Sequence, residues 1–176
     1  MDYRRPLIAA LLTTGLTVPI PAAAAEPYCG ITWGSTDKSQ WFVAAESTIT
    51  GVRAGRHDCY DRLVVDLADA QEQDYDLRYQ DSIYDFVTGA PIALRGGAYL
   101  MVLLDSGPNQ FWDPAKRTEL VDVGGYRTFR QVAYTGRYRS GLYLALGVRA
   151  RLPYRVSTLR TPGRPTRLVI DVAHQW

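Results

Sequence analysis

The sequence predicts an all-β protein, a β-sandwich of two antiparallel sheets with about eight strands and one disulfide. A short valine-rich run at residues 62–67 returns almost unchanged at residues 167–172. Other short runs alternate between apolar and polar residues, and turn signals separate them. No stretch shows a convincing helical period. A closed β-barrel is the alternative arrangement of the same strands.

The repeated run begins with an arginine, continues with branched apolar residues, and carries an aspartate one step before its end. Successive side chains of a strand point to opposite faces, so Asp66 and Asp171 should point away from the apolar residues. We expect both copies to be strands of one domain, although coincidence between valine-rich strands is the alternative. The side chains expected in the core are Leu63, Val65, Leu67, Leu168, Ile170 and Val172.

The other runs complete the expected sheets. Residues 98–104 are apolar on both faces, which predicts a central strand. Residues 142–152 alternate, which places Tyr143, Arg149 and Arg151 together on the face opposite the leucines. Residues 36–40 are polar and are expected to form a loop. The remaining expected strands are residues 48–54, 77–79, 126–134 and 154–159.

Residues 1–25 have the features of a signal peptide. Two arginines precede an apolar stretch at residues 7–18, and three alanines end the segment. The apolar stretch is too short to span a membrane, and no other run has that length. A disordered or anchoring N-terminus is the alternative. We therefore expect residues 26–176 to form one domain that is secreted, either extracellular or in the cell envelope.

The two cysteines, Cys29 and Cys59, both follow the predicted signal peptide. Export to an oxidising compartment favours a disulfide between them, with two free buried thiols as the alternative. This disulfide would tie the N-terminal arm to the start of the first repeated strand.

Charge is distributed unevenly along the chain. Residues 58–85 hold nine acids and two arginines, whereas residues 123–170 hold ten arginines and no acid. Arginine presents a planar fork to carboxylates and phosphates, and tyrosine presents a flat face to sugar rings. One interpretation is a ligand surface, and the other is cross-strand pairing of these arginines with the acids of residues 58–85. The expected ligand-binding residues are Arg137, Arg139, Tyr143, Arg149, Arg151 and Trp112.

Catalytic motifs are scarce. A zinc amidase needs several histidine or glutamate ligands, and this chain has only His57 and His174. With Asp58 or Asp61 these histidines would form a weak metal site; alternatively, they orient strand ends by hydrogen bonding. The sequence lacks a nucleophile elbow and a phosphate-binding glycine loop. We expect no enzyme activity, no cofactor and no metal, although the acidic segment leaves a sugar hydrolase as an alternative.

Residues 52–67, 94–97 and 167–174 together resemble the AMIN-like domain of secreted and lipid-anchored actinobacterial proteins. That family is related to the AMIN domain, which accompanies cell-wall amidases and secretins. The resemblance implies a two-sheet β-sandwich that is targeted to the cell envelope, with peptidoglycan as ligand, and it transfers no functional residues.

We therefore expect a secreted, non-catalytic domain that binds peptidoglycan or an anionic wall polymer and not nucleic acid. An accessory subunit for an envelope protein is the alternative function, and an envelope glycan hydrolase is another.

Overall fold

The computed structural model describes residues 27–42, 47–68, 73–107 and 113–176. The predicted signal peptide at residues 1–25 and the predicted ligand residue Trp112 lie outside this part of the chain. The described residues form nine strands and two short 3-10 turns. These elements are η1 (Tyr28–Gly30), β1 (Lys38–Gln40), β2 (Thr48–Arg56), β3 (Tyr60–Ala68), β4 (Tyr75–Gln80), β5 (Ala98–Asp105), η2 (Pro114–Lys116), β6 (Phe129–Tyr138), β7 (Gly141–Val148), β8 (Tyr154–Leu159) and β9 (Thr166–Ala173).

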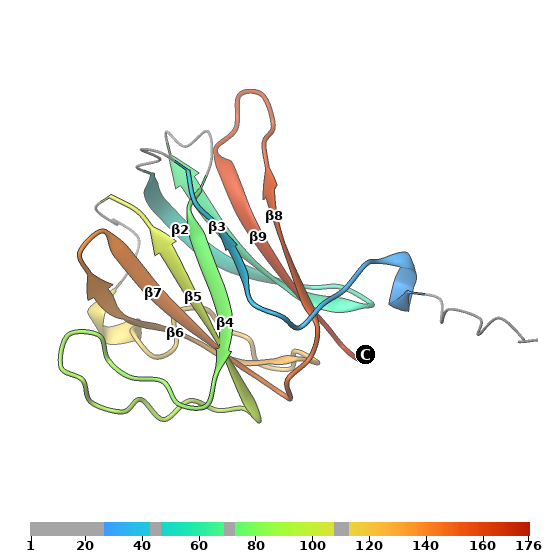
Figure 1. Cartoon of the computed structure of the whole chain (residues 1–176), viewed down its shortest axis with the longest axis horizontal. Helices are drawn as coiled ribbons and strands as arrows, with labels where there is room; N and C mark the ends of the chain where they lie inside the picture. The colour runs from blue at the N-terminus through green and yellow to red at the C-terminus, as the bar shows by residue number, and fades with distance from the viewer. Residues whose placement is uncertain (1–26, 43–46, 69–72, 108–112) are drawn as a thin grey trace, which may run out of the picture.

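The strands form two antiparallel sheets, which confirms the predicted all-β sandwich (Figure 1). The five-stranded sheet has the order β1-β4-β5-β7-β6, and the four-stranded sheet has the order β2-β3-β9-β8. The apolar run predicted to be central is β5, which lies in the middle of the five-stranded sheet. The repeated runs are β3 and β9, the two inner strands of the four-stranded sheet.

The core lies between the sheets. In the register of β3 and β9, Leu63 lies opposite Ile170 and Val65 lies opposite Leu168. All six apolar side chains predicted from the repeat have no solvent exposure and belong to one core cluster. Burying one such side chain stabilises the fold by about 1.5–3 kcal/mol relative to leaving it exposed.

Two predicted elements were wrong. Residues 38–40, predicted to be loop, form β1 and pair with β4. The strand predicted for residues 142–152 ends at Val148, because Ala98, the first residue of β5, lies opposite it. The N–H of Arg149 then donates to the carbonyl of Thr128, 2.8 Å away, just before β6 begins. Arg149 and Arg151 therefore do not share a strand face with Tyr143.

Residues 81–97 cover part of the outer face of the five-stranded sheet. Ile83 and Leu94 pack on Ala133 and Ala145 in a second buried cluster. The chain passes so close to β7 that a Cβ added at Gly147 would lie 1.9 Å from the carbonyl oxygen of residue 95. Any other residue at position 147 would therefore displace this covering segment.

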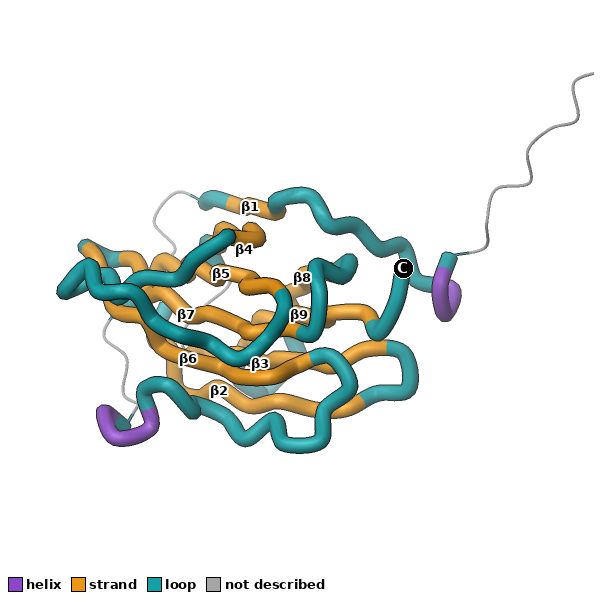
Figure 2. The backbone as a smooth tube through the Cα atoms, turned by 90° about the horizontal axis from the view of Figure 1, so that it is seen from below, coloured by secondary structure: helices purple, strands orange, loops and turns teal. Residues whose placement is uncertain are grey.

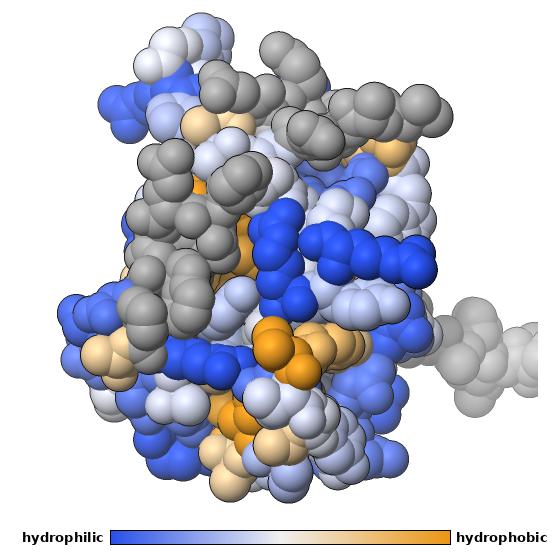
Figure 3. All heavy atoms as spheres, turned by 90° about the vertical axis from the view of Figure 1, so that its left-hand side faces the viewer, coloured by the Kyte–Doolittle hydropathy of each residue, from blue (hydrophilic) through white to orange (hydrophobic). Residues whose placement is uncertain are grey.

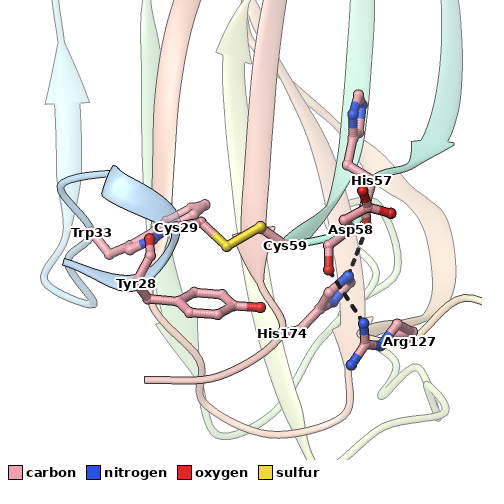
Figure 4. Close-up of a disulfide and its surroundings, with 8 residues drawn as sticks. All are labelled: Tyr28, Cys29, Trp33, His57, Asp58, Cys59, Arg127 and His174. Atoms are coloured by element: carbon pink, nitrogen blue, oxygen red, sulfur yellow. Dashed lines mark hydrogen bonds between the residues drawn. A yellow bond between two sulfur atoms is a disulfide. The ribbon is translucent and has the colours of Figure 1, made fainter. Parts of the chain in front are cut away.

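The predicted disulfide between Cys29 and Cys59 is present (Figure 4). It fastens the N-terminal arm beside the start of β3. The arm also forms an isolated bridge from Gly34 to Tyr154, the first residue of β8. Figure 2 shows this arm passing close to the C-terminal end of the chain. The disulfide and the bridge hold the arm along one end of the four-stranded sheet.

Candidate ligand-binding face

The outer face of the four-stranded sheet carries a ladder of arginines and aspartates. Because side chains alternate along each strand, the residues opposite the core set of the repeat point outward. They are Arg62, Val64 and Asp66 on β3 and Arg167, Val169 and Asp171 on β9.

Antiparallel pairing of the two copies crosses their charges. Arg62 lies opposite Asp171, and Asp66 lies opposite Arg167, with Val64 and Val169 paired between them. Each end of the ladder therefore contains one arginine opposite one aspartate. The neighbouring strands β2 and β8 make these two ends different.

At one end, which we call the closed end, Arg62, Arg155 and Asp171 form a complete ion-pair network. Arg62 donates from Nε and Nη2 to the two Asp171 oxygens at 2.6 and 2.9 Å, and Arg155 Nε lies 2.8 Å from Oδ2. Asp171 is fully buried. The Arg155 guanidinium also lies over the rings of Trp33 and Tyr60, at 5.4 and 5.3 Å from their centroids. Both oxygens of the carboxylate are therefore used within the protein.

At the other end, which we call the open end, Arg53, Asp66 and Arg167 are not paired in the same way. Arg53 donates from Nε and Nη2 to Asp66 at 2.9 and 3.0 Å and so occupies both carboxylate oxygens. Arg167 Nη2 donates instead to Thr161 Oγ1, 3.0 Å away. Its Nε is shielded from solvent and has no hydrogen-bond partner among the described residues. An unsatisfied buried donor costs about 1–3 kcal/mol, so the open end retains an unfilled binding capacity.

Gly51 explains why Arg53 reaches Asp66. The pairing of β2 with β3 shifts register between Ile49 and Gly51, and Gly51 lies directly opposite Asp66. A Cβ at this position would lie 3.4 Å from Asp66 Oδ2. The missing side chain leaves the carboxylate accessible to the arginine two residues further along β2.

Two adjoining hollows open beside this end, with volumes of about 210 and 360 Å³. Arg53 and Arg167 line both of them. The buried side chains of Val64 and Val169 line the smaller hollow and give it an apolar floor. Of the residues lining the two hollows, four are arginines and one is an acid, namely Arg53, Arg62, Arg164, Arg167 and Asp66. The face therefore offers a cationic recess on an apolar base.

The residues predicted from the sequence to bind ligand are not all brought together. Arg137, Arg139 and Tyr143 lie at the β6–β7 hairpin, and Arg149 follows the opposite end of β7, roughly 23 Å away at 3.3 Å per residue. Arg137 donates to the carbonyls of residues 106, 107 and 140, so it braces a loop. Tyr143 stacks on Phe86 with ring centroids 3.6 Å apart.

Near the far end of β7, Arg149 donates to the backbone carbonyl of His174. Arg151 lies over the Tyr79 ring, 5.2 Å from its centroid, and lines a hollow of about 240 Å³ that Tyr79 and Tyr99 also line. Burial raises the pKa of Tyr79 to about 12, against the opposing effects of its hydrogen bond to Leu152 and of Arg151. The Tyr79 hydroxyl therefore remains a donor, and Arg151 of this predicted pair faces this hollow.

Internal pairing of the arginine-rich half with the acidic segment can be checked only among the described residues, and Asp69 and Glu72 lie outside them. The six pairs between described residues join no arginine of residues 123–170 to an acid of residues 58–85. Arg155 pairs with Asp171, which lies outside that acidic segment. Arg127 reaches the segment through the backbone carbonyl of Asp58.

Sequence reasoning missed the arginines that line the hollows. The signal was present in the repeat, because antiparallel pairing of two runs with arginine first and aspartate near the end must place each arginine opposite an aspartate. Whether the arginine from the edge strand shares an aspartate or occupies both of its oxygens depends on the geometry of that strand, and a sequence pattern does not give it.

The two histidines approach each other without forming a common ligand set. His174 is buried, with Nδ1 2.8 Å from Thr128 Oγ1 and Nε2 2.9 Å from the backbone carbonyl of His57. The His57 ring turns away from His174 and stacks on Tyr60 (Figure 4). No group of three or more potential metal-ligating side chains occurs within the part of the chain that the structure describes. His174 thus orients the end of β9.

Comparison with known proteins identifies the family. No helix among the described residues is long and apolar enough to cross a membrane. A comparison with curated proteins gives no significant match. The family model of the AMIN-like domain matches residues 47–174, which include both copies of the repeat and strands β2 to β9. The chain therefore belongs to the AMIN-like domain family.

Proposed function

We propose that this chain is a secreted, non-catalytic domain that binds the cell envelope, with peptidoglycan or an anionic wall polymer as its ligand. Membership of the AMIN-like family supports an envelope-associated role. The observation that carries the proposal is the pair of arginine-lined hollows on the outer face of the four-stranded sheet. Clustered arginines suit the carboxylates and phosphates that such polymers present.

The chemistry of this face favours binding over hydrolysis. Glycoside hydrolysis needs two carboxyl groups that are free to transfer protons or attack the sugar. Asp66, the acid that lines the larger of these two hollows, holds both its oxygens against Arg53, and Asp171 is buried between two arginines. Neither carboxylate is free to act on a substrate.

An accessory subunit for an envelope protein is the alternative, and exposed apolar side chains at the five-stranded sheet favour it. Tyr84, Val87 and Tyr138 are exposed near the β6–β7 hairpin. In the side view of Figure 3, however, the visible apolar side chains form several separate areas. Stable protein interfaces use a larger contiguous apolar core. Stoichiometric co-purification with one envelope protein would establish this alternative.

A pull-down on purified wall sacculi, with and without their anionic polymers, tests the proposal. The double variant Arg53→Gln with Arg167→Gln should lose binding and keep its melting temperature within a few degrees. Wild-type binding should weaken as salt rises, because exposed charges are screened beyond about 10 Å at 0.1 M salt. Retention that is equal in all samples and insensitive to salt would contradict binding through this face.

The residues predicted from sequence provide the matched comparison. The double variant Arg149→Gln with Arg151→Gln also removes two positive charges, but from the other end of the sandwich. We expect it to retain wall binding. If it loses binding while the Arg53 and Arg167 variant keeps it, the ligand surface is the hollow formed by Arg151, Tyr79 and Tyr99.

A further inference from the structure

We infer that the open end is a binding site for a phosphate group, as a phosphomonoester or phosphodiester. This inference deepens the proposed function and rests on it only for the biological source of the phosphate. The site comprises Arg53, Arg164 and Arg167, which belong to β2, the turn before β9 and β9 itself, and Arg62 of the closed end borders it.

The first argument is the unfilled donor. Arg167 Nε is excluded from solvent without a partner among the described residues, and the same side chain lines both hollows. Arg62 is the equivalent arginine in the first copy of the repeat, and its Nε donates to Asp171. The first copy therefore shows an anionic oxygen filling the position that is unfilled at Arg167. Once the Arg167 side chain turns toward the hollows, an oxyanion bound there would satisfy this donor, because Arg53 already occupies both oxygens of Asp66.

The second argument is the balance of charge in the recess. Four arginines line the two hollows, and Asp66 neutralises one of them through a two-point ion pair. Arg62 is neutralised through buried Asp171, which Arg155 also contacts. Arg164 and Arg167 remain as positive charges without a carboxylate in the described ion pairs. This excess favours an anionic ligand.

The third argument selects phosphate over carboxylate. The arginines of the site approach the recess from β2, from the turn before β9 and from β9, so their N–H groups suit an anion with acceptors on several sides. A carboxylate has two oxygens in one plane, whereas a phosphate presents three or four around a tetrahedral centre. The smaller hollow, about 210 Å³, lies below the roughly 300–1,000 Å³ of pockets for drug-sized ligands and suits one such group. Its apolar floor strengthens hydrogen bonds made above it.

Calorimetric titration of the whole domain with inorganic phosphate and with glycerol phosphate, at fixed ionic strength, tests the inference. Saturable binding is expected for the wild type. Arg167→Gln should weaken it about tenfold, the effect of losing one charge-assisted hydrogen bond. Arg167→Lys keeps the charge and removes the forked donor, so it should weaken binding nearly as much. Lys116→Gln removes a charge outside both hollows and should bind as the wild type does.

The controls separate this inference from the proposed function. Acetate that competes as well as phosphate, or an Arg167→Lys variant with wild-type affinity, would overturn the phosphate site. Phosphate binding without retention on sacculi would leave the site standing and overturn the wall function. If the wild type binds no phosphate and Arg167→Gln is retained on sacculi as well as the wild type, the phosphate site is overturned and the wall function stands. Phospholipid vesicles, run beside phosphate-bearing wall polymer, identify which source the domain prefers.

Discussion

The closed and open ends of the ladder come from the same repeated sequence but differ in their hydrogen bonds. At the closed end Asp171 accepts from Arg62 and Arg155, and all three groups are satisfied. At the open end Asp66 is taken by Arg53, and Arg167 Nε has no partner among the described residues. The closed end therefore stabilises the sheet, and the open end retains donors for a ligand.

The edge strands produce this difference. Arg155 on β8 lies directly opposite Asp171, and it shares the carboxylate with Arg62. On β2 the residue opposite Asp66 is Gly51, and the arginine comes from two positions further along. A structural ion pair and a ligand site can thus arise from one repeated motif when the neighbouring strand changes register.

The largest effect should come from removing the carboxylate of the closed end. Asp171→Ala leaves two guanidinium groups without their shared partner, and breaking a buried pair costs about 3–5 kcal/mol. Asp66→Ala is the matched change at the open end, where the pair is exposed and worth about 0–1 kcal/mol. Urea unfolding measures both. Equal losses from the two variants would show that the ends do not differ in stability as described.

The disulfide should stabilise the closed end without contributing to the open end. It fastens the arm that carries Trp33, which lies against Arg155. Closing a loop with a sequence separation of 30 contributes about 3.5 kcal/mol in the chain-entropy model. The double variant Cys29→Ser with Cys59→Ser should therefore unfold at lower urea concentration and bind phosphate with unchanged affinity. A loss of affinity in the folded variant would show that the two ends are coupled.

A smaller, pH-dependent contribution should come from Asp85, on the segment that covers the five-stranded sheet. Hydrogen bonds from the N–H groups of Thr88 and Val87, together with Arg117, hold its pKa below the ordinary value of 3.8 despite opposing desolvation. A lowered folded-state pKa means that the ionised group stabilises the fold above pH 3.8 and that this contribution disappears as the pH falls through the lowered value.

Stability measured between pH 6 and pH 2 should therefore decline less steeply in Asp85→Asn than in the wild type. The variant should lose a little stability at neutral pH and keep its affinity for phosphate, because Asp85 lies on the segment that covers the other sheet. An unchanged acid profile would contradict a contribution from Asp85.

The sequence was sufficient for the sandwich, because the repeat alternates strictly and its six apolar side chains fill the core. It was sufficient for the disulfide, because two cysteines in a chain predicted to be exported leave one pairing. It did not predict the end of β7. Apolar and polar residues continue to alternate after Val148, although β5 offers no partner beyond Ala98.

The candidate site was less predictable. The ten arginines between residues 123 and 170 predicted a ligand surface in that half of the chain. Several of them instead donate hydrogen bonds to backbone carbonyls. Two of the arginines that line the hollows, Arg53 and Arg62, come from outside it. Only the register of three strands, β2, β3 and β9, brings them beside Arg167, and register depends on packing and on the bulge in β2.

The most direct test of the difference between the two ends is an NMR titration that follows the arginine Nε–H resonances as inorganic phosphate is added. The resonance of Arg167 should shift and saturate, because phosphate supplies its missing acceptor. Those of Arg62 and Arg155 should stay in place, because Asp171 already satisfies them. An unmoved Arg167 resonance, or equal shifts at Arg62 and Arg155, would contradict the assignment of one end to stability and the other to binding.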